Sequence, residues 1–274
     1  MLEVKDLHIH FYNSDHDAVK GISFTIPTGA IIGLVGESGS GKTITSMAIC
    51  GLLSRSLAAC TGTILLDGEE ILTMSRADMR KKQGSAISVV FQEPMTAMDP
   101  CMRIGPQIEE ALRLHTNLGE EERKSRALQA MRDAELPEPE AVYTKYPHEL
   151  SGGMLQRAMI AAAIINEPSL LICDEPTTAL DVTIQAQILK LLQKINREKG
   201  TTILFISHNL NVVKKLCSRI LVMEKGLLVE EGTAEEIFSN PRQPYTKKLI
   251  AAIPTRQRKI KDLLQQEKEA RHDG

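Results

Sequence analysis

The segment that most constrains this chain is the octapeptide GESGSGKT at residues 36–43. It follows an apolar run at residues 31–35 and precedes a helical pattern at residues 42–53. A buried strand, a glycine-rich turn and a helix in this order form a nucleotide-binding unit, and the octapeptide fits the phosphate-loop pattern G-x-x-x-x-G-K-[ST]. The sequence therefore predicts an α/β fold built around a phosphate-binding loop.

The residue types of this loop suit a bound triphosphate. Its glycines let backbone N–H groups wrap a phosphate, and the start of the following helix adds about half a positive charge. Lys42 is placed to reach the β- and γ-phosphates, and the hydroxyl of Thr43 is placed to ligate Mg²⁺. We therefore expect ATP and Mg²⁺ as ligands. The expected nucleotide-binding residues of the loop are Gly36, Glu37, Ser38, Gly39, Ser40, Gly41, Lys42 and Thr43.

Two adjacent carboxylates follow a second apolar run. The run SLLIC at residues 169–173 leads directly into Asp174 and Glu175. Ligands of α/β sheets gather at the carboxyl ends of the strands, so Asp174 is expected to complete the Mg²⁺ site. Glu175 lies one residue further toward the phosphates and is expected to act as general base on the attacking water. Cys173 is expected to be a small buried hydrophobic residue.

Apolar periodicity predicts the layers of the fold. Period-two patterns at residues 2–11 and 22–26, separated by a polar loop at 13–17, predict an antiparallel layer at the start of the chain. Short continuous apolar runs separated by helical stretches predict a parallel sheet covered by helices. These runs occupy residues 31–35, 169–173, 202–207 and 219–223.

The middle and the end of the chain differ in character from the rest. Residues 94–156 hold no convincing strand but two amphipathic helical patterns, at 104–115 and 120–134, and the proline-rich break LPEPE. We therefore expect an α-helical subdomain at about 94–156, inserted into an ATP-binding domain of residues 1–254. Residues 255–274 are mostly charged and are expected to form a separate tail.

Composition narrows the functional classes. The 274 residues carry a formal net charge of -2 without a single-sign block, so neither a nucleic-acid partner nor a polybasic membrane anchor is expected. No apolar stretch approaches the roughly twenty residues that span a bilayer, and the amino terminus alternates like a strand, so the chain is expected in the cytoplasm.

Five cysteines without a CxxC pair predict free thiols. His8 and His10, on one strand face, are expected to be solvated rather than metal-bound.

The sequence LSGGMLQR at residues 150–157 opens a long apolar helical pattern. Taken alone, it has two interpretations of about equal weight. One is a serine N-cap with glycines that ease helix packing. The other is an anion site formed by the hydroxyl of Ser151 and the glycine N–H groups. A phosphate loop and an Asp-Glu pair elsewhere in the same chain favour the anion site.

Six motifs together make the chain resemble the ATP-binding subunits of ABC transporters, from about residue 2 to about residue 250. In chain order they are GESGSGKT, VVFQEP with Gln92, LSGGM at 150–154, Asp174 with Glu175, ALD at 179–181 and ISHNL with His208. The resemblance implies a P-loop (RecA-like) nucleotide-binding core with an antiparallel β layer and an inserted α-helical subdomain. It also implies ATP hydrolysis between two such domains that face each other head to tail.

The resemblance implies that one segment of each domain serves the nucleotide of the other. Ser151, Gly152 and Gly153 would close on the γ-phosphate held by the opposite phosphate loop. Asp181 would shape the seam between the two domains. ATP would then hold the pair together, and its hydrolysis would loosen the pair.

Three further roles follow from the resemblance. Gln92 would contact Mg²⁺ or water and sense the transmembrane subunits. His208 would hydrogen-bond the γ-phosphate. An aromatic residue near the amino terminus would stack on adenine. Phe11 is the first choice and Tyr12 the alternative, because strand alternation lets only one of them face the site.

Within the family, segments such as FQEPMTAMDP and QPYTKKLI look most like the ATPases of importers for oligopeptides, dipeptides and nickel. Leu155 in SGGMLQR resembles the nickel-type members, so nickel or a metal chelate is an alternative cargo to peptides. The implied partners are a second ABC ATPase, either a paralogue or a copy of the chain, two transmembrane permease subunits and, indirectly, an extracytoplasmic substrate-binding protein. The implied location is the cytoplasmic face of the cell membrane. A more distant alternative is a soluble ABC-type ATPase without a transport role.

Overall fold

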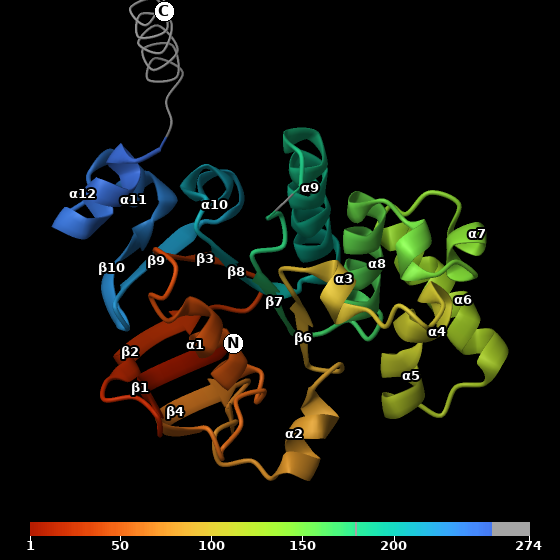
Figure 1. The fold of residues 1–274 in the computed structure, drawn as a ribbon, viewed down its shortest axis with the longest axis horizontal. Helices are drawn as coiled ribbons and strands as arrows, with labels where there is room; N and C mark the ends of the chain where they lie inside the picture. Colours follow the sequence, from red (N-terminus) through yellow and green to blue (C-terminus); the bar gives the residue numbers. More distant parts are fainter. Residues whose placement is uncertain (179, 254–274) are drawn as a thin grey trace, which may run out of the picture.

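The computed structural model describes residues 1–178 and 180–253. Two β-sheets, one antiparallel and one mostly parallel, form the body of the molecule, with helices around them (Figure 1). Ala179 of the ALD motif and the expected tail at 255–274 lie outside the described residues. Among the described residues, no helix is long and apolar enough to cross a membrane.

The smaller sheet is antiparallel, with strand order β2-β1-β4-β5. Its strands are β1 (Leu2–Phe11), β2 (Asp17–Ile26), β4 (Ala58–Leu66) and β5 (Glu69–Glu70). Leu2 and Val4 of β1 are buried in alternation, as the period-two pattern predicts, and after a register shift the alternation resumes with Leu7 and Ile9. Strand β2 begins five residues before the predicted start at Ile22, because its pairing with β1 continues as far as Asp17 opposite His10.

The larger sheet has the strand order β10-β9-β3-β8-β7-β6. Its strands are β3 (Ile31–Val35), β6 (Ile87–Val90), β7 (Leu170–Asp174), β8 (Thr202–Ser207), β9 (Arg219–Glu224) and β10 (Leu227–Thr233). All pairs are parallel except that of β9 with β10 at one edge. Every residue of β3, β7 and β8 is buried, which explains why these strands appear in the sequence as continuous apolar runs.

Six helices lie outside the segment between β6 and β7 among the described residues. They are α1 (Lys42–Ile49), α2 (Arg76–Lys82), α9 (Val182–Lys199), α10 (Leu210–Leu216), α11 (Ala234–Ser239) and α12 (Pro244–Ala251). Helix α1 is shorter than the predicted helix at 42–53. Gly51 takes a left-handed backbone conformation, with φ of 64°, and a glycine in this conformation ends a helix.

Between β6 and β7 the described chain contains helices and no strand. They are α3 (Pro94–Ala97), α4 (Ile104–Ile108), α5 (Glu110–His115), α6 (Glu120–Asp133), α7 (Pro139–Tyr143), the 3-10 turn η1 (Pro147–Glu149) and α8 (Gly152–Ile164). The single helix predicted at 104–115 is two helices, α4 and α5, although Glu109 between them keeps helical angles of φ -70° and ψ -15°. Figure 1 shows α4 to α8 grouped on one side of the molecule, beyond α9.

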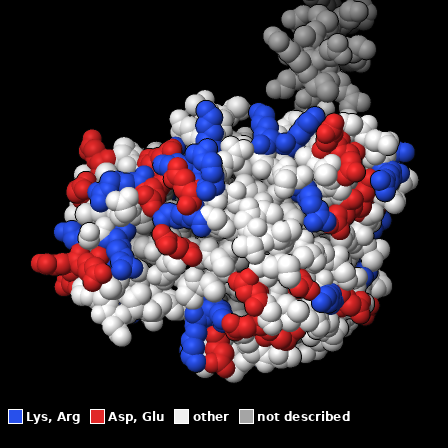
Figure 2. All heavy atoms as spheres, turned by 180° about the vertical axis from the view of Figure 1, so that it is seen from behind, with Lys and Arg blue, Asp and Glu red and all other residues white. Residues whose placement is uncertain are grey.

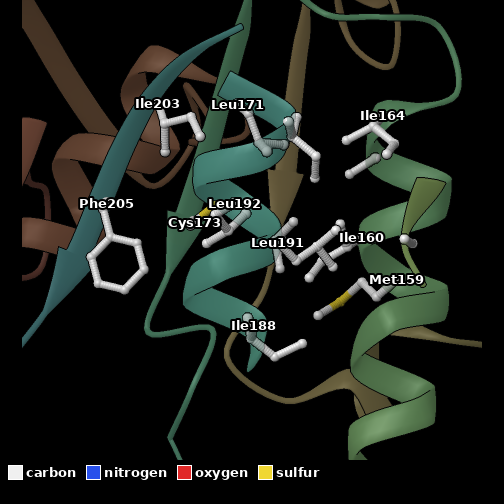
Figure 3. Packing of buried hydrophobic residues seen from close by; sticks show 14 of the residues in the cluster. Met159, Ile160, Ile164, Leu171, Cys173, Ile188, Leu191, Leu192, Ile203 and Phe205 are labelled. Carbon is white, nitrogen blue, oxygen red and sulfur yellow. The ribbon is translucent and has the colours of Figure 1, made fainter. Parts of the chain in front are cut away.

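Helix α8 joins this helical group to the larger sheet. Figure 3 shows Met159, Ile160 and Ile164 of α8 pointing toward α9, where Ile188 and Leu191 face them. Strands β7 and β8 add further side chains to the same cluster, Leu171, Cys173, Ile203 and Phe205. Cys173 is fully buried, as expected. Because α8 and α9 share one core, their amino-terminal ends are held at fixed positions relative to each other.

A close approach of β3 to α10 yields a stability prediction. A Cβ on Gly33 would lie 2.4 Å from Cγ1 of Val213 and 3.1 Å from Sγ of Cys217. We therefore expect Gly33→Ala to lower the free energy of unfolding by about 1–3 kcal/mol, as overpacking of a close-packed core does. Urea denaturation measures the change. Gly119→Ala is the control, because a Cβ on Gly119 meets nothing within 4 Å. Equal stability of the two variants would contradict this account of the packing.

Candidate nucleotide site

The phosphate loop connects β3 to α1 and packs tightly against other strands. Gly36 has φ of 156°, and a Cβ there would lie 2.2 Å from the carbonyl oxygen of Met223 in β9. Gly41 has φ of 104°, and a Cβ there would lie 2.9 Å from the carbonyl oxygen of Ala18 in β2. Both positions therefore require glycine, for their backbone angles and for the space. Glu37, Ser38 and Gly39 are exposed at the rim of the loop, whereas Ser40 is buried.

Lys42 lies inside the loop, with only 5% of its surface exposed. Its ammonium group donates hydrogen bonds to the carbonyl oxygens of Gly36 and Glu37, both at 2.9 Å, and approaches Oγ of Ser40 at 3.4 Å. Burial lowers the pKa of Lys42 from its ordinary value, while the carboxylates of Glu175 and Asp174 oppose this shift. The loop thus holds a cation that is hydrogen-bonded to neutral carbonyl groups. A phosphate anion could bind this cation.

Asp174 ends β7 beside the start of α1. The hydroxyl of Thr43 donates a hydrogen bond of 3.4 Å to Oδ1 of Asp174. Burial raises the pKa of Asp174 from its ordinary value, although the hydrogen bond from Thr43 opposes the shift. A hydroxyl and a carboxylate oxygen are the hard oxygen ligands that Mg²⁺ takes in proteins. The two side chains that the sequence assigns to Mg²⁺ are thus adjacent and of a suitable type.

Glu175 and His208 form a pair at the same edge of the sheet. Nδ1 of His208 lies 2.9 Å from Oε2 of Glu175, and the hydroxyl of Thr178 donates to the same oxygen at 3.0 Å. The backbone of Glu175 is left-handed, with φ of 49°, an uncommon state for a residue other than glycine. Its N–H still bonds to the carbonyl of Ile206, so the strand pairing continues one residue beyond β7. The structure thus brings Lys42, Asp174, Glu175 and His208 together.

Among the described residues, neither Gln92 nor the two aromatic candidates form a side-chain hydrogen bond with this cluster. Gln92 is exposed, two residues beyond the end of β6, and no hydrogen bond of its side chain is present among the described residues. Phe11 is half-buried against the core under the smaller sheet. Tyr12 is 62% exposed and its hydroxyl donates to the carbonyl of Arg55 at 3.5 Å. The adenine contact of Phe11 therefore stays a prediction.

The segment LSGG forms the amino-terminal cap of α8. Oγ of Ser151 accepts the N–H of Met154 at 3.4 Å, and both Ser151 and Gly152 are exposed. A Cβ on Gly153 would lie 2.9 Å from Cγ2 of Ile184, so this glycine lets the start of α8 pack closely on α9. Asp181 caps α9, where Oδ1 accepts the N–H groups of Thr183 and Ile184, both at 2.9 Å. Ser151 and Asp181 therefore belong to two neighbouring helix starts on the surface.

Several contacts were absent from the sequence analysis. The buried guanidinium of Arg157 in α8 donates to the carbonyl of Ala134 at 3.0 Å and to Oε1 of Gln187 in α9 at 3.1 Å. The hydroxyl of Tyr245 in α12 accepts the N–H of Glu37 in the phosphate loop at 2.9 Å. Each contact joins segments far apart in the chain, so no local pattern indicates it. The segment QPYTKKLI, which contains Tyr245, resembles the family but does not by itself indicate this contact.

The two strand histidines have a partner that the sequence analysis missed. Oδ1 of Asp17 lies 2.9 Å from Nδ1 of His10, and Oδ2 lies 3.7 Å from Nδ1 of His8. The pairing of β1 with β2 brings Asp17 to them. Among the described residues, no group of three or more His, Cys, Asp or Glu side chains is arranged to hold a metal ion.

Positive and negative side chains are interspersed on the face opposite that of Figure 1 (Figure 2). The larger charged clusters there contain both signs side by side. Such a surface produces no extended field of one sign.

Comparisons with known proteins agree with this geometry. The family model described as ABC transporter matches residues 19–178, and the model described as oligopeptide/dipeptide transporter, C-terminal region, matches residues 229–273. The chain is 45% identical over 258 residues to the oligopeptide transport ATP-binding protein OppD of Bacillus subtilis, covering 93% of this chain and 72% of that protein. It is 43% identical over 258 residues to the dipeptide transport ATP-binding protein DppD of Lactococcus lactis, covering 93% and 74%.

Solved structures of similar fold include an ATP-binding cassette and a part of an ABC transporter complex. The dimeric post-hydrolysis state of the ATP-binding cassette MJ0796, bound to ADP and Pi, has a TM-score of 0.77 and 28% identity, covering 85% of this chain and 99% of that one. The structure of cbiO1 from Clostridium perfringens, part of the ABC transporter complex cbiONQ, has a TM-score of 0.75 and 28% identity, covering 96% and 98%. The fold class predicted from the sequence is confirmed.

The buried carboxylate of Asp174 yields a second stability prediction. Burial raises the pKa of Asp174 above the ordinary 3.8, so the free energy of unfolding falls as pH rises from 3.8 to the raised pKa, and the full penalty applies above that pKa. Asp174→Asn removes the charge, so we expect the nucleotide-free variant to be more stable than the unaltered protein at pH 7, by about 0.5–2 kcal/mol.

Urea denaturation without nucleotide or Mg²⁺ measures this difference. The difference should vanish under acid conditions in which Asp174 of the unaltered protein is protonated. Asp15→Asn, at an exposed loop position, is the control and should leave the stability at pH 7 unchanged. A less stable Asp174→Asn protein at pH 7 would show that the charge at this position is not the source of strain.

Proposed function

The chain belongs to the ABC transporter family, and from this membership we infer that it is the ATP-binding subunit of a peptide importer. It hydrolyses ATP to drive the uptake of oligopeptides or dipeptides. The observation that carries the proposal is the meeting of Lys42, Asp174 and Glu175 at one edge of the sheet, in a chain matched by an oligopeptide/dipeptide transporter model at 229–273. We propose residues 1–254 as one ATP-binding domain, with residues 94–156 as its helical subdomain.

Each side chain of the site has a chemical task in this proposal. Backbone N–H groups of the phosphate loop and the ammonium of Lys42 bind the β- and γ-phosphates. Thr43 and Asp174 would hold Mg²⁺, with Gln92 as a further oxygen ligand, and the ion would neutralise phosphate charge. Glu175 is the base that accepts a proton from the attacking water. His208, at hydrogen-bond distance from Glu175, would orient that carboxylate and reach the γ-phosphate.

A second ATPase subunit completes the site. We propose that Ser151, Gly152 and Gly153 bind the γ-phosphate held by the opposite subunit, and that Asp181 lies at the seam between the subunits. Ser151 and Gly152 are exposed at the start of a thirteen-residue helix, whose N-terminus attracts anions. Gly153 and Ile184 hold this helix start against the one that Asp181 caps. The partner is either a paralogue or a second copy of the chain.

The membrane partners would bind beside Gln92. A groove of about 380 Å³ lies between β6 and the helical group, lined in part by Phe91, Met98, Ala111, Leu114 and Met159. Phe91 is 44% exposed and Leu114 is 72% exposed, so large apolar side chains line its mouth. An exposed apolar patch of this kind marks a surface for a partner. We propose that each ATPase subunit of the pair binds one of two permease subunits here, at the cytoplasmic face of the membrane, and that the permease receives substrate from an extracytoplasmic binding protein.

Peptides are favoured over nickel as cargo. The alternative of nickel or a metal chelate rests on Leu155, which resembles the nickel-type members at that position. In the structure Leu155 is fully buried in the core that α8 shares with α9. Packing is therefore sufficient to explain an apolar residue there, and Leu155 carries no information about cargo.

The assignment of Glu175 predicts a separation of binding from hydrolysis. Glu175→Gln keeps the size and the hydrogen-bonding oxygen but removes the base, so we expect hydrolysis to fall by about 10²–10⁴-fold with ATP still bound. Phosphate release and ATP binding measure the two effects. Glu138→Gln is the matched control, because Glu138 also has a left-handed backbone, with φ of 47°, but lies exposed in the helical group. Near-normal hydrolysis by Glu175→Gln would remove this assignment.

The transport role is tested by purification from membranes. A tagged chain expressed with its neighbouring subunits should co-purify with two permease subunits, and Phe91→Asp with Leu114→Asp should reduce this association because both place a charge at the apolar mouth of the groove. Recovery of the chain from the soluble fraction alone, without permease subunits, would favour the soluble ABC-type ATPase instead.

A further inference from the structure

The carboxyl-terminal helix α12 reaches the phosphate loop through one side chain. The hydroxyl oxygen of Tyr245 accepts a hydrogen bond from the backbone N–H of Glu37 at 2.9 Å, across 208 residues of sequence. Glu37 itself is exposed at the rim of the loop. The contact is therefore a direct link between the segment after β10 and the expected nucleotide site.

The N–H that Tyr245 accepts belongs to the peptide unit that Lys42 also holds. In this unit the carbonyl of Gly36 and the N–H of Glu37 are parts of one plane and point in opposite directions, since no described peptide bond is cis. The ammonium of Lys42 donates to the carbonyl oxygen at 2.9 Å, and Tyr245 accepts the N–H at 2.9 Å. Two side chains thus fix the orientation of this peptide plane from its two sides.

The position of Tyr245 is itself fixed before nucleotide binds. The carboxylate of Glu230 in β10 accepts the N–H groups of Arg242 at 2.7 Å and Gln243 at 3.1 Å, just before α12 begins. Pro244 occupies the first turn of α12, where a backbone N–H would have no partner within the helix, so proline costs no hydrogen bond there. The ring of Tyr245 packs against the main core, and burial raises the pKa of its hydroxyl, which therefore stays protonated at neutral pH.

Nucleotide binding would change one of the two hydrogen bonds that hold the Gly36–Glu37 peptide, the one from Lys42. In the proposed function, Lys42 turns from the carbonyls of Gly36 and Glu37 to the phosphates. The carbonyl of Gly36 then loses its hydrogen bond from Lys42. Because Gly36 has no side chain, its own conformational preference does little to prevent rotation of the peptide unit. The hydrogen bond from the N–H of Glu37 to Tyr245 remains and still holds the peptide unit.

We propose that Tyr245 is a positioning residue for nucleotide binding, which keeps the Gly36–Glu37 peptide in the binding orientation while Lys42 engages the phosphates. The proposal rests on the proposed function of the loop. It assigns to the segment 229–253 a role at the nucleotide site of its own subunit. Tyr245 touches the loop but not the reacting atoms, so its effect should appear in ATP affinity and not in the rate of the chemical step.

The experiment uses the full chain with Tyr245→Phe, which removes the hydroxyl and keeps the ring. We expect the Kd for ATP in the presence of Mg²⁺, measured by calorimetry, to rise about fivefold, the effect of one lost hydrogen bond. In the complex with its partner subunits, the KM for ATP should rise by a similar factor while kcat at saturating ATP stays within about twofold of the unaltered protein.

Tyr143→Phe is the matched control. Its hydroxyl also forms a hydrogen bond within the fold, donating to Oε1 of Glu109 in the helical group rather than bonding to the loop. This variant should keep the Kd for ATP, whatever its effect on thermal stability. An unchanged Kd in Tyr245→Phe, an equal rise in Tyr143→Phe, or a fall in kcat at unchanged KM would each overturn the proposal.

Lys42→Ala separates failure of this inference from failure of the proposed function. Loss of ATP binding in Lys42→Ala together with an unchanged Kd in Tyr245→Phe would overturn only the role of Tyr245. Normal ATP binding by Lys42→Ala would contradict the nucleotide site itself, and the role of Tyr245 with it.

Discussion

The buried ammonium group of Lys42 is the interaction on which the nucleotide site depends. A desolvated cation is costly unless partners surround it, and here the carbonyls of Gly36 and Glu37 provide direct hydrogen bonds while Asp174 and Glu175 provide negative charge. That environment exists only because β3 and β7, far apart in sequence, end at the same edge of one sheet with β8 between them. The parallel sheet thus serves to bring a cation and two carboxylates together, and a triphosphate with its metal ion can replace the neutral partners of Lys42.

One chain carries two surfaces of different chemistry. The first is the phosphate loop with its carboxylates, and the second is formed by the starts of α8 and α9, capped by Ser151 and Asp181. The shared core of α8 and α9 makes the second surface rigid, and the guanidinium of Arg157 adds a polar tie between the same helices. A pair of subunits arranged head to tail would place each second surface over the first surface of its partner. In this account the two nucleotides form part of the subunit interface.

The sequence predicted those parts of the fold that local pattern determines. Continuous apolar runs identified β3 and β8 to the residue, because strands buried on both faces need apolar side chains at every position. Strand β4 was not predicted. Its sequence AACTGTILL has small and polar residues at positions where an alternating apolar pattern would indicate a strand. The site residues came from motifs and from the family resemblance. The pairing of His208 with Glu175 and the bond from Glu37 to Tyr245 arise from tertiary structure, for which a single sequence contains no local signal.

Sedimentation of the Glu175→Gln protein, with and without ATP and Mg²⁺, tests the central claim most directly. The claim is that Ser151 and its glycines bind a nucleotide held by another subunit. The account predicts that ATP produces a dimer, of two copies or with an equimolar second ATPase subunit, and that adding Ser151→Arg abolishes it. Adding Ser75→Arg, which removes the equivalent serine cap of α2, should leave the dimer intact. The account would be contradicted if the ATP-bound protein stayed monomeric both alone and with the second ATPase subunit. A dimer that persists after Ser151→Arg would also contradict it.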